Sequence, residues 1–145
     1  MVIQSCTGMM ILLLLTSCGF SDSRDEAAEV MNRYFAAIEV QDYTVAMDLY
    51  ADAFFRDTSR DAWEAQLRSY RRLLGDLESF EAISWNVKKN VGVKAGTFVR
   101  VVYRTRYSRH PAMEQFILKK ADEGFRIISH RLDAEKAPGG KTQFV

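Results

Sequence analysis

Residues 97–107, with the sequence TFVRVVYRTRY, alternate between two kinds of side chain over their whole length. One set contains Thr97, Val99, Val101, Tyr103, Thr105 and Tyr107, and the other contains Phe98, Arg100, Val102, Arg104 and Arg106. Successive side chains of a β-strand point to opposite faces of the sheet. The pattern therefore predicts a long strand with one largely apolar face and one basic face.

The segments on both sides of this strand predict further strands. Before it, Ile83, Trp85 and Val87 alternate with Ser84, Asn86 and Lys88. After it, the sequence predicts a turn over residues 108–111, a strand over 112–120, a turn over 122–124 and a last strand over 125–132. Strands joined by such short turns predict a meandering antiparallel sheet.

The first half of the chain instead shows the three- and four-residue spacing of amphipathic helices. Ser23 and Glu26 predict a capping box, Asp42 and Ser59 predict two further helix N-caps, and Gly75 predicts the end of the third helix. The apolar stripes are Ala27, Val30, Met31, Tyr34, Phe35 and Ile38; then Tyr43, Ala46, Met47, Tyr50 and Phe54; then Trp63, Leu67, Tyr70 and Leu74. Helices followed by a sheet predict an α+β domain, with the long helix across the apolar, curved face of the sheet.

The N-terminal stretch Leu-Leu-Leu-Leu-Thr-Ser-Cys, residues 12–18, resembles a bacterial lipobox. The apolar run before it is much shorter than the roughly 20 residues of a membrane-spanning helix and suits a signal peptide. The resemblance implies that residues 1–17 are removed and that Cys18 receives lipid, which tethers the protein to a membrane. The alternatives are an ordinary cleaved signal, or a short buried apolar segment with a free thiol. By the same resemblance, Gly19 in place of Asp implies transport to the periplasmic side of the outer membrane, or the outer face of the cell membrane in a host with one membrane.

Length, charge and cysteine content restrict the remaining possibilities. The predicted divisions are a signal peptide (1–17), a short tether (18–24), one folded domain (25–134) and a polar tail (135–145). Cys6 lies in the signal, so no cysteine besides Cys18 remains for a disulfide or a zinc site. We expect no metal and no cofactor. Net charge is only +1, which does not favour nucleic-acid binding, although residues 1–80 carry 7 basic and 13 acidic residues and the rest carry 13 and 6.

Several motifs of the chain resemble a known fold family. The residues that carry the resemblance are Trp63, Leu74, Gly75, Glu114, Phe116, Leu118, Gly124, Phe125, Arg126, Ile127 and Ile128. With the helices first and the strands afterwards, they resemble the nuclear transport factor 2-like (cystatin-like) cone fold, and within it small bacterial lipoproteins of unknown function. The resemblance implies a cone of helices and sheet that often holds a small ligand. In its enzymatic relatives, an Asp or His lies inside that cavity.

Two residues are weak candidates for a catalytic base in such a cavity. Glu114 points inward if its strand directs Phe116 and Leu118 to the core, although an ion pair across strands with Arg100 or Arg104 is the more ordinary role. His130 alternates with Ile128 and Leu132 and could also point inward, although a structural histidine is more common. The sequence alone gives no acid or thiol partner for this histidine and hence no catalytic constellation.

Aromatic and basic residues provide the other candidate sites. Tyr34, Tyr50, Trp63, Tyr103 and Tyr107 could line a ligand pocket, because they combine apolar rings with polar tips; the alternative is plain core packing. The basic face, Arg100, Arg104 and Arg106, could bind an acidic protein, anionic lipid or cell-wall polymer, or form a homodimer through the sheet. A solvated charged surface is its simplest interpretation.

These observations favour a lipid-anchored envelope protein with a non-enzymatic domain that binds a small ligand or a protein. One alternative is a cone-fold enzyme of the isomerase, dehydratase or hydrolase type acting on a small molecule. Another is a structural subunit of an envelope assembly. The volume of the cavity separates the first two, because a binding pocket for a small molecule needs about 300 Å³ or more.

Overall fold

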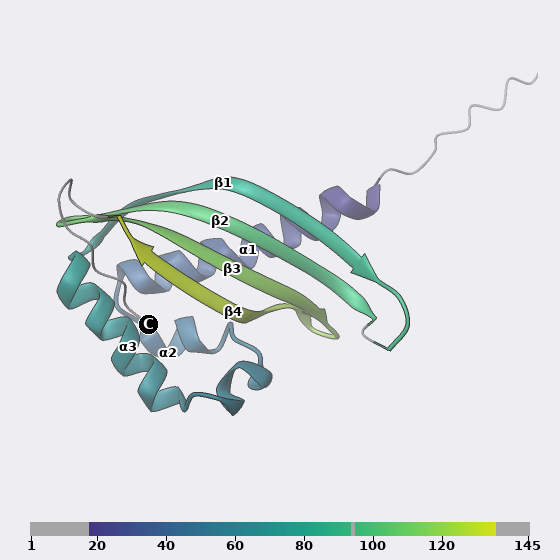
Figure 1. Cartoon of the computed structure of the whole chain (residues 1–145), viewed down its shortest axis with the longest axis horizontal. Coiled ribbons are helices and arrows are strands. Elements are labelled where there is room, and N and C mark those ends of the chain that lie inside the picture. Colours follow the sequence, from purple (N-terminus) through teal and green to yellow (C-terminus); the bar gives the residue numbers. More distant parts are fainter. Residues whose placement is uncertain (1–17, 94, 136–145) are drawn as a thin grey trace, which may run out of the picture.

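The computed structural model describes residues 18–93 and 95–135, and its elements follow the order helices, then strands (Figure 1). The predicted signal peptide (1–17) and residues 136–145 of the predicted tail lie outside the described residues. The elements are α1 (Cys18–Glu39), α2 (Tyr43–Met47), the 3-10 helix η1 (Asp52–Arg56), α3 (Arg60–Leu74), β1 (Leu77–Asn90), β2 (Gly96–Tyr107), β3 (Pro111–Ala121) and β4 (Gly124–Ala134). The α+β prediction is confirmed.

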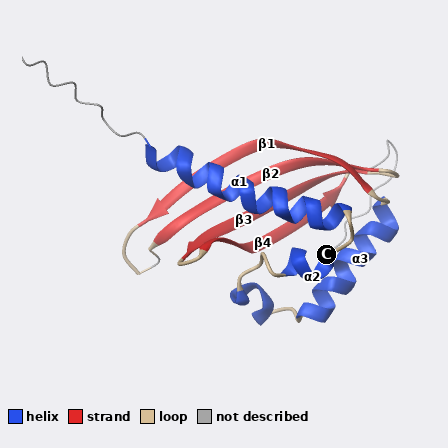
Figure 2. Ribbon diagram, turned by 180° about the vertical axis from the view of Figure 1, so that it is seen from behind, coloured by secondary structure: helices blue, strands red, loops and turns tan. Residues whose placement is uncertain are grey.

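The four strands form one curved sheet in the order β1-β2-β3-β4, and each neighbouring pair is antiparallel. Figure 2 shows α1 lying across one face of this sheet, with α2 and α3 below it on the same side. The predicted alternation of β2 is confirmed, because Val99, Val101, Tyr103, Thr105 and Tyr107 are all buried against the helices. The face with the arginines points away from them.

Three register shifts interrupt the sheet, and two of them change the parity of residues considered in the sequence analysis. A register shift between Ala82 and Ser84 inserts an extra residue into β1, so Ile83 is 41% exposed, while Ala82 and Trp85 pack against the core. The prediction that Ile83 shares a face with Trp85 is therefore wrong. A second shift, between Ile117 and Leu118 of β3, places an extra residue in the partner strand β4. The inward alternation of β4 therefore also changes, and Ile127 lies in the core.

The helix boundaries differ from the prediction at two places. α1 already includes Cys18, so Ser23 lies inside the helix, the predicted capping box is wrong, and residues 18–24 are helical. The second helix ends after one turn because Tyr50 forms a bridge with Ile127 of β4. There the amide of Ile127 donates to Leu49 O at 2.9 Å, and the amide of Ala51 donates to Ile127 O at 2.8 Å.

The other helix signals are confirmed. The side chain of Asp42 accepts from the amide of Val45 at 3.1 Å, and the hydroxyl of Ser59 accepts from the amide of Ala62 at 3.1 Å. Gly75 ends α3 with a φ of +93°. Among the described residues, no helix has the length and apolar character needed to cross a membrane.

Candidate functional site

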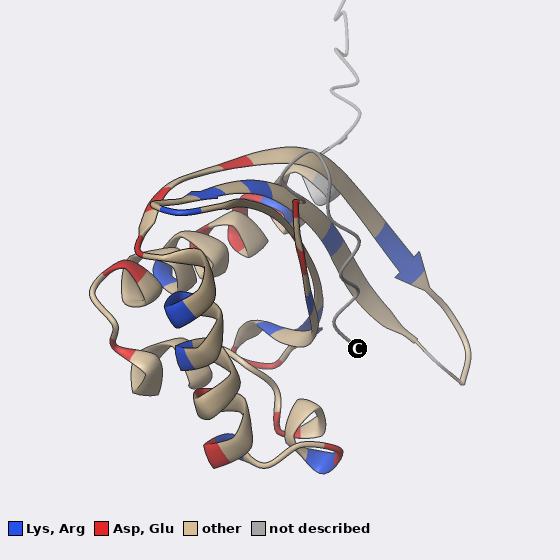
Figure 3. Cartoon of the chain, turned by 60° about the vertical axis from the view of Figure 1, so that its left-hand side comes forward, with Lys and Arg blue, Asp and Glu red and all other residues tan. Residues whose placement is uncertain are grey.

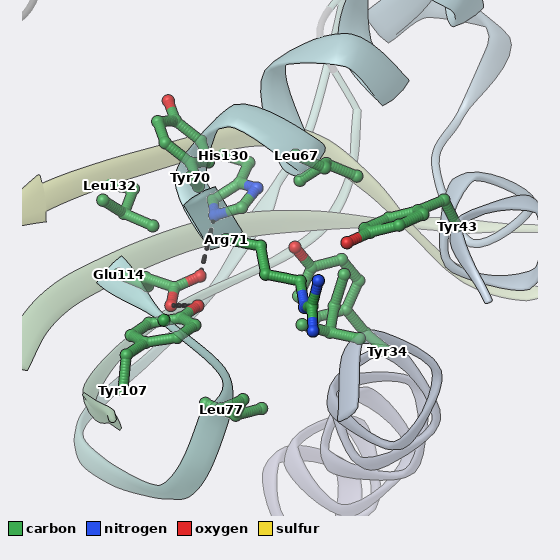
Figure 4. A pocket seen from close by; sticks show the side chains of 12 residues that line it. Tyr34, Tyr43, Leu67, Tyr70, Arg71, Leu77, Tyr107, Glu114, His130 and Leu132 are labelled. Carbon is green, nitrogen blue, oxygen red and sulfur yellow. Dashed lines mark hydrogen bonds and ion pairs between the residues drawn. The ribbon is translucent and has the colours of Figure 1, made fainter. Parts of the chain in front are cut away.

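A chain of polar side chains runs through the interior, between the sheet and the helices (Figure 4). Tyr107 donates its hydroxyl proton to Glu114 Oε1 at 2.6 Å, and Glu114 Oε2 lies 3.0 Å from His130 Nε2. The other ring nitrogen, His130 Nδ1, lies 2.8 Å from the hydroxyl of Tyr50. The side chains of Glu114 and His130 are each only 1% exposed. We call these four residues the interior polar cluster.

The strand pairing explains why these residues meet. Glu114 lies on the inward face of β3 between Ala112 and Phe116, both of which are fully buried. Tyr107 of β2 and His130 of β4 flank it on the two neighbouring strands. Tyr107 lies two inward positions from Tyr103, which is directly opposite Glu114, and His130 lies one inward position from Leu132, which is directly opposite on the other side. Tyr50 reaches His130 because the bridge to Ile127 holds its backbone against β4.

The environment keeps the tyrosines of the cluster protonated. Burial, followed by the carboxylate charge of Glu114, raises the pKa of Tyr107 well above its usual value. Burial likewise raises the pKa of Tyr50 and of Tyr34, whose ring lies 6.1 Å from that of Tyr50. In the neutral tautomer protonated at Nε2, His130 donates to Glu114 and accepts from Tyr50, and all the contacts of the cluster are satisfied.

The cavity beside this cluster is small. Its volume is about 20 Å³, which is room for about one water molecule. Its lining includes Tyr34, Tyr107, Glu114 and His130 from the predicted candidates, together with Tyr43, Tyr70, Arg71 and apolar residues. A small organic ligand needs a pocket of roughly 300 Å³ or more, so the interior is filled in this conformation.

The remaining pocket candidates pack in the core instead. Tyr103 is 3% exposed, and its ring contacts Phe35 with the centroids 4.8 Å apart. The ring of Trp63 lies 5.5 Å from that of His130 and 4.9 Å from that of Phe54. Neither Trp63, Tyr103 nor Tyr50 is among the residues that line the cavity.

The predicted arginine partners of Glu114 are wrong, and so is the prediction that His130 has no acidic partner, although both residues point inward. Arg100 donates to Gln115 at 2.5 Å, and Arg104 lies 3.9 Å from Glu81, so neither pairs with Glu114. His130 is not isolated, since it shares Glu114 with Tyr107. The sequence contains a signal for this cluster, because Tyr107, Glu114 and His130 each occupy an inward position of their own strand.

The outer face of the sheet carries the predicted basic residues. Arg100, Arg104 and Arg106 are exposed there, and Figure 3 shows basic residues along the strands of the sheet. The helices cover only the opposite face of the sheet. Within residues 18–93 and 95–135, no cluster of three His, Cys, Asp or Glu side chains is placed to hold a metal ion.

The fold is that of the cone-shaped α+β domains of the nuclear transport factor 2-like class, and solved structures share it. One is a candidate dehydratase of that family from Streptomyces avermitilis (TM-score 0.55, 9% identity, 81% of this chain and 99% of that chain covered). Others are Aln2 from a Streptomyces species (TM-score 0.55, 13% identity, 78% and 90% covered) and a candidate scytalone dehydratase from Novosphingobium aromaticivorans (TM-score 0.54, 14% identity, 85% and 93% covered). At these identities the likeness establishes the fold alone.

The chain belongs to the DUF4019 family of proteins of unknown function, whose model matches residues 30–130. This range includes α2, α3, the first three strands and every member of the interior polar cluster. A comparison with curated proteins finds no match. The fold prediction is thus confirmed, and the function has to be argued from this chain itself.

The buried tyrosines predict a steep loss of stability at high pH. Burial raises the pKa of Tyr103 to about 12, from about 10 in an unfolded chain. Above pH 10 the unfolded chain loses this proton first, so the free energy of unfolding falls by up to about 1.4 kcal/mol per pH unit for each such tyrosine. Stability is fully present below pH 10 and falls progressively above it.

Urea unfolding between pH 8 and 12 measures this slope. Tyr103→Phe should make the slope shallower by about 1.4 kcal/mol per pH unit between pH 10 and 12, because its contribution disappears. An unchanged slope in this variant would mean that Tyr103 titrates normally in the folded protein.

Proposed function

We propose that the chain is a lipid-anchored protein of the bacterial cell envelope that binds an acidic protein partner through the outer face of its sheet. One observation supports this more than any other: the interior is filled down to about 20 Å³, whereas the outer sheet face is left uncovered by the helices. Binding therefore takes place on the surface, and the interior polar cluster has a structural role.

The outer face has the chemistry of a protein interface. Three arginines of β2 project from it, and the exposed side chain of Ile83 and the partly buried Val102 add apolar surface. Arginine is enriched in interfaces because its planar group stacks and binds carboxylates with two hydrogen bonds. The contact of Arg104 with Glu81 is long, at 3.9 Å, and 59% of the Arg104 side chain stays exposed, which leaves it able to bind a partner.

A photo-crosslinking amino acid at position 83 tests this interface in cells. We expect a covalent adduct with another protein, and we expect Arg100→Glu, Arg104→Glu and Arg106→Glu together to abolish it. The matched control makes the same charge change at Arg33, Arg56 and Arg72 on the helices, which are exposed and should leave the adduct intact. Adducts that persist after reversal of the sheet arginines would contradict the proposal, and an adduct between two copies would identify the partner as this chain.

The anchor is supported by the lipobox resemblance, residues 12–18. Cys18→Ser should abolish metabolic labelling with palmitate, because the lipid is attached through a thioether that serine cannot form. The protein should then move from the membrane fraction to the soluble fraction. Ser17→Ala is the control, because it changes the neighbouring residue, leaves the thiol of Cys18 in place and should keep the label. Undiminished label in Cys18→Ser would disprove this anchor site, and with it the proposed location on the periplasmic side of the outer membrane or the outer face of a single cell membrane.

One observation favours a second function, a cone-fold enzyme of the isomerase, dehydratase or hydrolase type. The contact between Glu114 and His130 is that of a carboxylate that orients a general base, and both residues line the cavity. The cavity of about 20 Å³ would have to widen to admit a substrate. Small molecules that shift the NMR signals of the His130 ring would favour this function, and a ring unaffected by any member of a chemically diverse set would favour the first.

A further inference from the structure

The turn between β1 and β2 exposes two large apolar side chains. Val91 and Val93 are 94% and 106% exposed, more than any other large apolar side chain in the described part of the chain. Gly92 lies between them with a φ of +88°, and no atom lies within 4 Å of the position its Cβ would occupy. We call Val91, Gly92 and Val93 the hairpin tip. Two neighbouring apolar side chains at a projecting tip have no role in the core, which suggests a contact outside the protein.

The hairpin tip lies at the same end of the molecule as the start of α1. Figures 1 and 2 both show the β1–β2 turn and the first turns of α1 at one end of the long axis. Contacts agree with the pictures: the guanidinium of Arg24 lies 5.3 Å from the centre of the Trp85 ring in the second half of β1, and Lys120 near the end of β3 pairs with Glu26. The N-terminus of α1 therefore points toward the end that carries the tip.

We propose that the hairpin tip inserts Val91 and Val93 into the surface of the membrane to which the protein is anchored. The proposal rests on the lipid anchor at Cys18 given under the proposed function. Because α1 includes Cys18, the anchored residue lies only about 9 Å along the helix from Arg24. A helix that begins at the anchor turns the tip end of the domain toward the bilayer, so the two valines lie on the side that faces lipid.

The residues behind the tip suit the region of the lipid headgroups. On the outer face, Lys88 of β1, Phe98 of β2 and Lys119 of β3 lie side by side in register, and the Lys119 ammonium is 5.7 Å from the centre of the Phe98 ring. Lysines beside an aromatic ring are typical of membrane interfaces, where the charged ends stay in water. Asp22 and Asp25 lie near the same end, so the apolar tip, and not net charge, carries the proposal.

Hydrogen exchange on vesicles tests the contact without depending on the cell. The chain 18–145 keeps every described element, and its one thiol, Cys18, can be coupled to a maleimide phospholipid in phosphatidylcholine–phosphatidylglycerol vesicles. We expect the amides of residues 91–93 to exchange about tenfold more slowly than in the uncoupled chain, because burial of the valines excludes water. The exposed loop around Val40, at the other end of α1, should exchange at the same rate in both samples.

Two variants make the result specific. Val91→Asp together with Val93→Asp should remove the protection, whereas Val40→Asp, the matched change at another exposed valine, should keep it. Unchanged exchange at the tip of the coupled chain, or equal protection in the double variant, would overturn the proposal. Chemical coupling fixes the anchor in this experiment, so its outcome is separate from palmitate labelling, which decides whether cells acylate Cys18.

Discussion

Glu114→Ala is expected to lower the free energy of unfolding by about 3–5 kcal/mol. The truncation leaves the hydroxyl of Tyr107 and Nε2 of His130 without their partner. Water cannot replace this partner easily, because Glu114 is only 1% exposed. Each buried polar group left without a hydrogen bond costs about 1–3 kcal/mol, and the lost side chain leaves a cavity in addition. Urea unfolding at pH 7 measures the change.

Two further substitutions separate the causes. Glu114→Gln keeps the volume, and its amide can accept from Tyr107 and donate to His130 Nε2 once the imidazole takes the tautomer protonated at Nδ1, so we expect a smaller loss of about 1–2 kcal/mol. Glu81→Ala removes an exposed carboxylate on the outer face, 3.9 Å from Arg104, and should change stability by no more than about 0.5 kcal/mol. A loss below about 1 kcal/mol in Glu114→Ala would mean that the cluster does not stabilise the fold, and would favour the enzymatic alternative.

The sequence predicts those features that depend on near neighbours along the chain. The burial of Val99 and Tyr103 follows from simple alternation within one strand, and the inward position of Glu114 follows from Phe116 two residues later. The caps at Asp42 and Ser59 depend only on amides three residues away. In all these positions the physical cause lies within a few residues of its effect.

Features that depend on distant partners could not be predicted in the same way. The exposure of Ile83 results from an extra residue of β1 where this strand pairs with β2. The alternation of side chains in β1 alone does not predict this bulge. The second helix stops early because Tyr50 pairs with Ile127, a contact between residues far apart in the sequence. The link between His130 and Glu114 likewise needs the register of β3 on β4, which fixes what lies beside each carboxylate oxygen.

The junction between α3 and the sheet illustrates a local signal with a distant cause. Gly75 follows the last turn of α3, as a helix-ending glycine should, but the turn between β2 and β3 also packs on it. The amide of Arg109 donates to Leu74 O at 2.9 Å, and the hydroxyl of Ser108 accepts from the amide of Asp76 at 3.0 Å. A Cβ at position 75 would lie 2.0 Å from Ser108 Oγ and 3.0 Å from the backbone nitrogen of Arg109.

Gly75→Ala is therefore expected to lower the free energy of unfolding by about 3 kcal/mol, more than its backbone conformation alone requires. Gly124→Ala is the matched control, because its φ of +109° imposes a similar strain while no atom lies within 4 Å of the added Cβ. We expect a loss of about 1–2 kcal/mol there, the usual cost of a left-handed residue with a side chain. Urea unfolding of both variants at pH 7 gives the comparison.

A double-mutant cycle with Ser108→Ala isolates the collision. Ser108→Ala alone should lower the free energy of unfolding by about 1 kcal/mol, because the hydrogen bond to Asp76 is lost. The loss in the double variant should be smaller than the sum of the two single losses by about 1 kcal/mol. This coupling arises because the alanine at position 108 no longer has the oxygen that the new Cβ meets. Equal losses for Gly75→Ala and Gly124→Ala, with no coupling to position 108, would show that the serine rotates away freely. In that case Gly75 would be required only by its φ, and the end of α3 would not depend on close contact with the β2–β3 turn.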